Sequence, residues 1–191
     1  MAHIENGTFL SKKDIQQPVI TKKDIIDKFG FDYRSVVVER LKQLNNLPDG
    51  HQINFFDMAM RHEGSSGLYL AEEIIGTSWV FVQAMLGKGI STAHIHEEQV
   101  AELYVPLEGQ SMLNVDGIDQ ELTSGISFEV NPGQAHFIRT EEEKSCLNLL
   151  VMKNSAHIPR NELHKPIGYN HLVSLLGEEK VKNYFPNLLC R

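Results

Sequence analysis

The sequence predicts an all-β barrel or sandwich in the middle of the chain, with helical segments before and after it. Short runs of β-branched and aromatic residues follow one another there, separated by Gly, Pro, Asn and Asp, which is typical of sandwiches and barrels. The chain of 191 residues is 41% hydrophobic and 23% charged, as in a globular protein with a sizeable core. We therefore predict a helical N-terminal extension (1–50), a β-barrel (51–155) and a helical C-terminal tail (156–191).

The N-terminal extension is expected to contain two helices. Thr21 with Asp24 is a plausible start for the first, and Gly30 is a plausible end. The second is predicted from Arg34 to Asn46, because apolar residues recur there on one helical face. The residues of that face are Val37, Leu41 and Leu44. An apolar face needs a partner, and barrel edges are often covered by another subunit, so we expect a homodimer.

The barrel is expected to consist of short strands joined by well-marked turns. The predicted strands are 52–60, 67–75, 78–86, 101–109, 111–115, 126–130, 135–139 and 145–153. The predicted turns are Gly64-Ser65-Ser66-Gly67, Gly87-Lys88-Gly89, Glu108-Gly109, Asp116-Gly117 and Asn131-Pro132-Gly133. Asp-Gly is a favoured two-residue hairpin turn.

The C-terminal tail has a helical pattern. One helix is predicted from Tyr169 to Leu176, because Gly177 follows it. A second is predicted from Glu178 to Phe185, because Pro186 cannot continue it.

Charge, cysteines and hydropathy exclude several classes of protein. The net charge of -7, without a basic stripe, argues against a nucleic-acid-binding surface. The apolar runs are too short to span a membrane. Of the two cysteines, Cys146 is expected in the core and Cys190 in an exposed tail, so no disulfide is predicted. No signal peptide is recognisable either, so we expect a cytoplasmic protein.

Histidines and a glutamate at strand spacing predict a metal site. His94 and His96 are two residues apart, which on a strand places both imidazoles on one face. Glu102 begins the next strand-like run and reaches the same point if the chain reverses before it. Glu97 and Glu98 compete with it as carboxylate ligands, although Glu102 is better placed relative to the following strand.

A second segment supplies a third imidazole. The turn Asn131-Pro132-Gly133 precedes His136, which begins another predicted strand. Three imidazoles and one carboxylate suit one divalent transition ion, Fe, Mn, Ni, Cu or Zn, better than calcium or magnesium. Such an ion can keep open positions for water or substrate.

These two segments resemble the two motifs of the cupin superfamily. The first motif is His-x-His, a later glutamate and a glycine after six more residues, which corresponds to His94, His96, Glu102 and Gly109. The second begins at Gly125 and ends at His136, with Asn131-Pro132-Gly133 between them. The resemblance covers the middle half of the chain. It implies a double-stranded β-helix, or jelly-roll barrel, with one metal ion on the three histidines and the glutamate.

Further residues are candidates for the substrate pocket. Tyr104 is two residues beyond Glu102, so it either contacts substrate or fills the core. Gln83 lies in an alternating set with Trp79 and Phe81, which forms either a pocket wall or a core face. Asn148 interrupts an apolar strand and either supports the site or makes a local hydrogen bond. The remaining histidines without a partner at ligand spacing are expected on the surface or in loops: His51, His157, His164 and His171.

The resemblance leaves the reaction open, because one fold hosts many activities. One hypothesis is an enzyme that acts on a small organic substrate, with Glu102 and Tyr104 as catalytic residues. Its chemistry is either Lewis-acid isomerase or lyase chemistry on a sugar or carboxylic acid, or Fe(II) dioxygenase chemistry. The other hypothesis is a ligand-binding or sensing module without catalysis.

Overall fold

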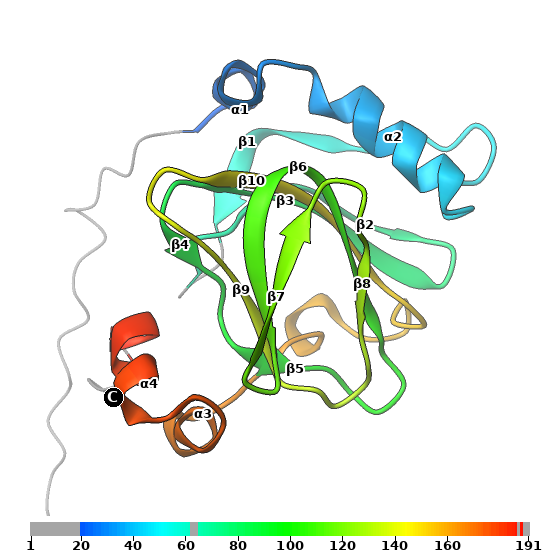
Figure 1. Cartoon of the computed structure of the whole chain (residues 1–191). Coiled ribbons are helices and arrows are strands. Elements are labelled where there is room, and N and C mark those ends of the chain that lie inside the picture. Colours follow the sequence, from blue (N-terminus) through cyan, green and yellow to red (C-terminus); the bar gives the residue numbers. More distant parts are fainter. Residues whose placement is uncertain (1–19, 62–64, 187, 189–191) are drawn as a thin grey trace, which may run out of the picture.

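The computed structural model describes residues 20–61, 65–186 and 188. It shows a β-barrel with helices on its outside (Figure 1), so the predicted all-β barrel is confirmed. The expectations about a signal peptide and about Cys190 lie outside the described residues. The strands are β1 (Phe55–Arg61), β2 (Leu68–Ile75), β3 (Ser78–Leu86), β4 (Gly89–Ile90), β5 (His94–Ile95), β6 (Glu102–Val115), β7 (Ile118–Thr123), β8 (Phe128–Val130), β9 (His136–Thr140), β10 (Ser145–Met152) and β11 (Lys165–Pro166).

The long strand β6 joins the two sheets of the barrel. The strand order is β1-β2-β3-β10-β6-β9-β5-β11, with β4 on β9 and both β7 and β8 on β6. The first half of β6 pairs with β10 and β8, whereas the second half, from Gln110, pairs with β7 and β9. Gly109 lies between the halves and has a left-handed φ of 76°. It is therefore the corner at which the strand passes from one sheet to the other.

The predicted turn at Glu108-Gly109 is wrong, because the chain continues there as one strand. The pairing of β6 with β10 shifts register between Leu147 and Asn148, so Leu107 is an extra residue opposite them. A bulge of this kind bends a strand without ending it, and it tolerates the nearby proline, Pro106.

The predicted hairpin turn at Asp116-Gly117 is confirmed, and the structure adds a returning strand that was not predicted. Asp116 and Gly117 both have positive φ, 49° and 88°, as a tight hairpin turn requires. The returning strand, β7, was not among the predicted strands. It pairs with β6 over its whole length, from Val115↔Ile118 to Gln110↔Thr123.

Two N-terminal helices cover the outer face of one sheet. Helix α1 (Lys22–Phe29) begins at a capping box of Thr21 and Asp24 and ends at Gly30, as predicted. Helix α2 (Tyr33–Gln43) buries Val37 and Leu41 completely, in one cluster with residues of β2, β3 and β10. The apolar face of α2 is therefore covered by the same chain and gives no argument for a dimer.

The C-terminal segment covers the other side of the barrel. Helices α3 (Tyr169–Leu176) and α4 (Glu178–Tyr184) match the predicted pair and pack with Phe137 of β9 and Ala93. Before them come a short 3-10 helix, η1 (Arg160–Glu162), and β11, which pairs with β5. The C-terminal segment thus contributes a strand to the barrel as well as helices.

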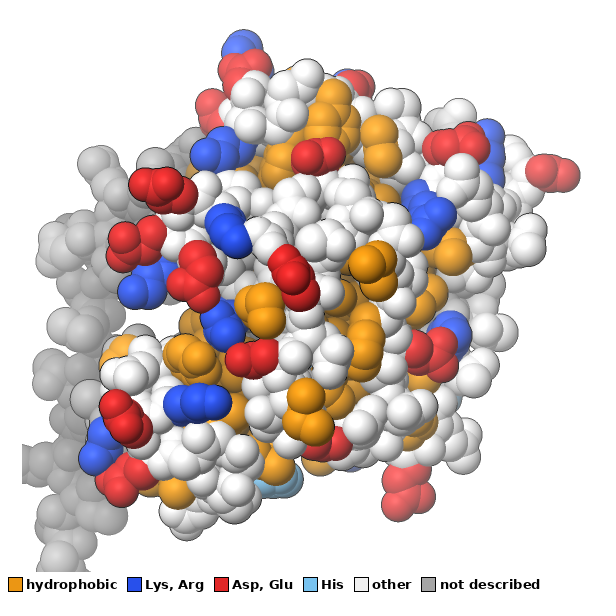
Figure 2. All heavy atoms as spheres, viewed as in Figure 1, with side chains coloured by type: hydrophobic (Ala, Val, Ile, Leu, Met, Phe, Trp, Pro, Cys, Tyr) orange, Lys and Arg blue, Asp and Glu red, His pale blue; other side chains and the backbone are white. Residues whose placement is uncertain are grey.

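The surface of the barrel carries both signs of charge. On the face shown in Figure 2, acidic and basic side chains are interspersed with apolar ones, and no extended basic patch is visible there. Among the described residues, no helix is both long and apolar enough to cross a membrane.

Candidate metal centre

The structure brings His94, His96, Glu102 and His136 together inside the barrel. His94 of β5 and His136 of β9 are direct cross-strand partners, and His96 follows His94 by two residues. Glu102 begins β6, which also pairs with β9. One ligand atom of each residue lies within 4.8 Å of those of the other three. Two donors that are each about 2.0–2.2 Å from one ion lie at most about 4.4 Å apart, so the side chains are within a few tenths of an ångström of the spacing that one ion requires.

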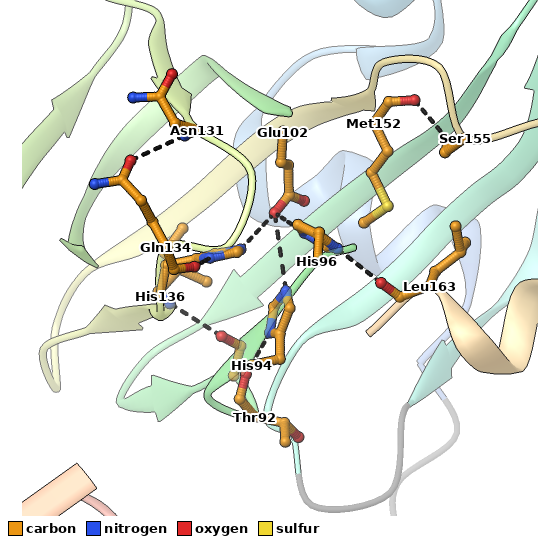
Figure 3. Close-up of polar contacts among 12 residues, drawn as sticks. Thr92, His94, His96, Glu102, Asn131, Gln134, His136, Met152, Ser155 and Leu163 are labelled. Carbon is orange, nitrogen blue, oxygen red and sulfur yellow. Dashed lines mark hydrogen bonds and ion pairs between the residues drawn. The ribbon is translucent and has the colours of Figure 1, made fainter. Parts of the chain in front are cut away.

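The three imidazoles point toward the Glu102 carboxylate (Figure 3). Glu102 Oε2 lies 2.8 Å from His136 Nε2 and 3.1 Å from His96 Nε2. His94 Nε2 is 3.9 Å away, which is too far for a hydrogen bond. The exposed fraction of these residues is 6% for His94 and 3% or less for the others. The cluster is therefore enclosed by protein.

Backbone carbonyls fix the tautomer of all three imidazoles. Each Nδ1 lies at hydrogen-bond distance from a carbonyl oxygen, and a carbonyl only accepts, so Nδ1 carries the hydrogen. The carbonyls belong to Thr92 for His94 (2.8 Å), Leu163 for His96 (2.7 Å) and Gln134 for His136 (2.9 Å). In a neutral ring, the lone pair then belongs to Nε2, which is the atom aimed at the centre.

A cation between these groups resolves an otherwise unfavourable arrangement. Three Nε2 lone pairs and a carboxylate are all acceptors, and they converge without a donor unless a ring is protonated. Two buried atoms of the cluster, His94 Nε2 and Glu102 Oε1, have no hydrogen-bond partner among the described residues. Buried polar atoms without partners are unfavourable, and a metal ion would pair both. The residues therefore fit a divalent transition ion.

The pKa shifts show how strongly the groups interact. Burial alone would raise the pKa of the Glu102 carboxyl, but contacts with His136, His94 and His96 together hold it well below its usual value. Burial lowers the pKa of His94 to about 4, and the neighbouring His136 adds to this effect. For His96, burial is outweighed by the hydrogen bond and charge of Glu102, which raise its pKa.

We expect the metal-stripped protein to lose stability as the pH falls from about 6.5 toward 4.5. The folded pKa values of His94 and His164 are depressed by burial, so the unfolded chain takes up protons that the folded chain does not. The raised pKa of His96 adds no slope in this window, because its contribution to stability is fully present below about 6.5 and is lost only as the pH rises through its folded pKa. The depressed pKa of Glu102 adds a further loss of stability only when the pH falls below about 4.5.

Within this window the slope is about two protons, one each from His94 and His164, or about 2.7 kcal/mol of unfolding free energy per pH unit. Urea unfolding of the metal-stripped protein at several pH values measures it. His94→Gln should flatten the slope by removing one of the depressed groups. Equal slopes for the two proteins would contradict this assignment.

The two competing carboxylates lie outside the cluster. Glu97 and Glu98 are exposed in the turn before Val100. Glu97 pairs with Lys165 of β11 at 2.6 Å. The structure thus places Glu102, rather than either neighbour, with the histidines.

The predicted pocket residues share the inner face of one sheet. Cross-strand partners form successive rows across β6, β10 and β3: Glu102–Met152–Trp79, then Tyr104–Leu150–Phe81, then Pro106–Asn148–Gln83. Tyr104 and Phe81 are buried in the barrel core, whereas Trp79 is partly exposed and donates its indole N–H to the Ile158 carbonyl. The row of Asn148 and Gln83 lies four residues from that of Glu102, about 13 Å along a strand.

Gln83 and Asn148 form a buried amide pair. They are cross-strand partners with exposed fractions of 2% and 0%. The Gln83 amide donates to the Tyr69 hydroxyl (3.3 Å), and the Asn148 amide contacts the Cys146 sulfur (3.3 Å). Both carbonyl oxygens, Gln83 Oε1 and Asn148 Oδ1, lack a hydrogen-bond partner among the described residues. The pair can thus accept hydrogen bonds from a hydroxyl, an amine or a water, and its assignment to the substrate pocket stays a prediction.

Sequence reasoning missed His164, which belongs to the site. We expected it on the surface or in a loop, without a relation to the other histidines. Its ring centroid lies 4.5 Å from that of His94 and 5.4 Å from that of His96. Burial holds its pKa well below the usual value. No spacing rule predicts this contact, because His164 reaches the site through the pairing of β11 with β5.

Comparisons with known proteins agree with this fold. Residues 81–152, which include all four clustered residues, match the family model described as Cupin domain. No curated protein sequence matches the chain. The structure is similar to that of the polyketide cyclase RemF from Streptomyces resistomycificus, with a TM-score of 0.51 and 18% identity over 68% of this chain and 99% of that one. It is also similar to a cupin-2 domain protein from Rhodospirillum rubrum, with a TM-score of 0.55 and 14% identity over 74% of this chain and 95% of that one.

Proposed function

Since residues 81–152 match the family model described as Cupin domain, we propose that this chain is a metal-dependent enzyme that acts on a small organic substrate. The cluster of His94, His96, Glu102 and His136 would hold one divalent transition ion. The observation that supports this most strongly is the fixed tautomer of the three imidazoles, which directs every Nε2 at one point. When bound there, such an ion supplies Lewis-acid chemistry or, if it is iron, a centre for O₂.

Two features of the chain favour Lewis-acid chemistry on an oxygen-rich substrate such as a sugar or a carboxylic acid. Burial and the neighbouring Glu102 raise the pKa of Tyr104 well above its usual value, so its phenol keeps its proton. Tyr104 could then donate a hydrogen bond to a substrate oxygen near the centre. The amide pair Gln83–Asn148 could accept a hydrogen bond only from a part of the substrate that extends about 13 Å from the Glu102 row.

The expected homodimer also stays a prediction.

Metal analysis combined with a substrate screen tests the proposal. The protein is purified without added ions, and its metals are identified by elemental analysis. We expect about one transition ion per chain, because one such cluster of donors is found among the described residues. Turnover is then measured on a panel of sugars, sugar acids and carboxylic acids. The panel also includes a polyketide, since the similar structure RemF is named a polyketide cyclase.

The outcomes separate the competing functions. Isomerisation or elimination without O₂ consumption supports Lewis-acid chemistry. Iron with substrate-dependent O₂ uptake indicates a dioxygenase instead. A chain that binds metal tightly but turns over nothing on the panel favours a sensing module. The matched control is His171→Ala, because His171 is exposed on α3 and should change neither metal content nor turnover.

A further inference from the structure

A segment after β10 closes the barrel next to the metal centre. We call residues 155–167 the C-terminal strap. At its start, Trp79 N donates to Ser155 Oγ (3.0 Å), and the Trp79 indole donates to Ile158 O (3.1 Å). At its end, Ile167 N donates to Ala93 O (3.1 Å), just before His94. The strap therefore runs from β3 to the segment that carries the histidines.

The middle of the strap is anchored on both sides of His164. Arg160 pairs with Glu72 at 3.0 Å, and its guanidinium lies over the Phe81 ring at 5.0 Å. Leu163, the residue before His164, accepts the hydrogen bond from His96 Nδ1. Lys165, the residue after it, pairs with Ile95. The backbone at His164 is thus fixed to the strand that holds the metal ligands.

His164 is the outermost of the four imidazoles. The three histidines of the cluster are buried, whereas His164 is partly exposed. Its ring nevertheless touches the site from outside, because it lies against both His94 and His96. It also makes an edge-to-face contact with Phe81, at a centroid distance of 6.1 Å. His164 is therefore the most solvent-exposed imidazole of this group.

We infer that His164 is a substrate-contacting residue, placed by the strap to meet a ligand bound beside His94 and His96. This inference rests on the proposed function, because such a ligand needs the metal. We do not count His164 among the proposed metal ligands, because the group whose ligand atoms lie within 4.8 Å of one another consists of the other four residues. The ligand class is a small molecule with an oxygen or nitrogen donor, and the imidazole would form a hydrogen bond to it.

Azide binding to the cobalt-loaded protein tests this role without an assay of activity. Azide occupies an open position on the metal, and its binding changes the visible spectrum of Co(II). His164→Phe keeps a ring of similar size but removes both nitrogens. We expect it to retain a full complement of cobalt and to bind azide about 10-fold more weakly, the effect of losing one hydrogen bond. His164→Asn keeps a donor and an acceptor, so it should recover part of the affinity.

The matched control is His157→Phe, an exposed histidine on the same strap, which should leave azide binding unchanged. Wild-type azide affinity in His164→Phe would overturn the inference, and so would loss of cobalt from that variant, which would make His164 a ligand. If the wild-type protein takes up no cobalt, the proposed function fails and this inference fails with it. The two failures are distinguishable. Failure of the proposed function appears as absent cobalt binding by the wild-type protein, whereas failure of this inference appears only in the His164→Phe variant.

Discussion

Glu102→Gln is expected to weaken metal binding by about 100-fold or more, or about 2.7 kcal/mol. Glu102 is the only carboxylate within the described cluster, and its charge would offset half of that of a divalent ion among three neutral rings. The amide of Gln has almost the same size, so the shape of the site is kept while the charge is lost. Competition against a chelator of known affinity measures the change in dissociation constant.

The neighbouring glutamates provide the control for this experiment. Glu98→Gln removes a carboxylate of the same turn but leaves the cluster intact, since Glu98 is exposed. We expect its metal affinity to equal that of the wild-type protein. Tight metal binding by Glu102→Gln together with loss of metal from Glu98→Gln would show that the ligand set is wrong.

Gly109→Ala is expected to destabilise the protein by about 4 kcal/mol or more, which places it among the exceptional single substitutions. A Cβ at this position would lie 1.9 Å from the backbone oxygen of Ser145 on β10. The backbone itself must move to relieve that contact, and its φ of 76° disfavours any side chain. Urea unfolding gives the change in free energy.

Gly125→Ala is the matched control for the corner of β6. Its φ of 91° is also left-handed, but no atom lies within 4 Å of a Cβ built there. It should therefore show only the conformational effect, about 1–2 kcal/mol. Equal destabilisation by the two substitutions would mean that Gly109 is not required for the close approach of β6 and β10.

The sequence allowed the barrel and its flanking helices to be predicted from local patterns, whereas the grouping of His94 and His96 with Glu102 and His136 was predicted with the help of the resemblance to two cupin motifs. Helix α1 has its capping box at Thr21 and Asp24, and α3 ends at Gly177. His94 and His96 lie close together because alternate residues of a strand share a face. Helix capping and strand alternation depend on residues that are close in the sequence, so they can be recognised without knowledge of the tertiary structure.

Features that depend on contacts distant in the sequence were not predictable in this way. A turn and a strand corner both use glycine, so the sequence around Gly109 does not distinguish between them. Only the pairing of β6 with two sheets distinguishes the cases. His164 follows His96 by 68 positions in the sequence, and its contact with the site depends on how the C-terminal strap crosses the barrel.

Anomalous diffraction from crystals of the protein, recorded on both sides of the absorption edge of the metal found by elemental analysis, tests the central claim most directly. We predict one anomalous peak per chain, at coordination distance from Nε2 of His94, His96 and His136 and from the Glu102 carboxylate, about 2.0–2.2 Å for zinc. Metal-replete crystals with a peak elsewhere, or with these four side chains turned away from one another, would contradict it.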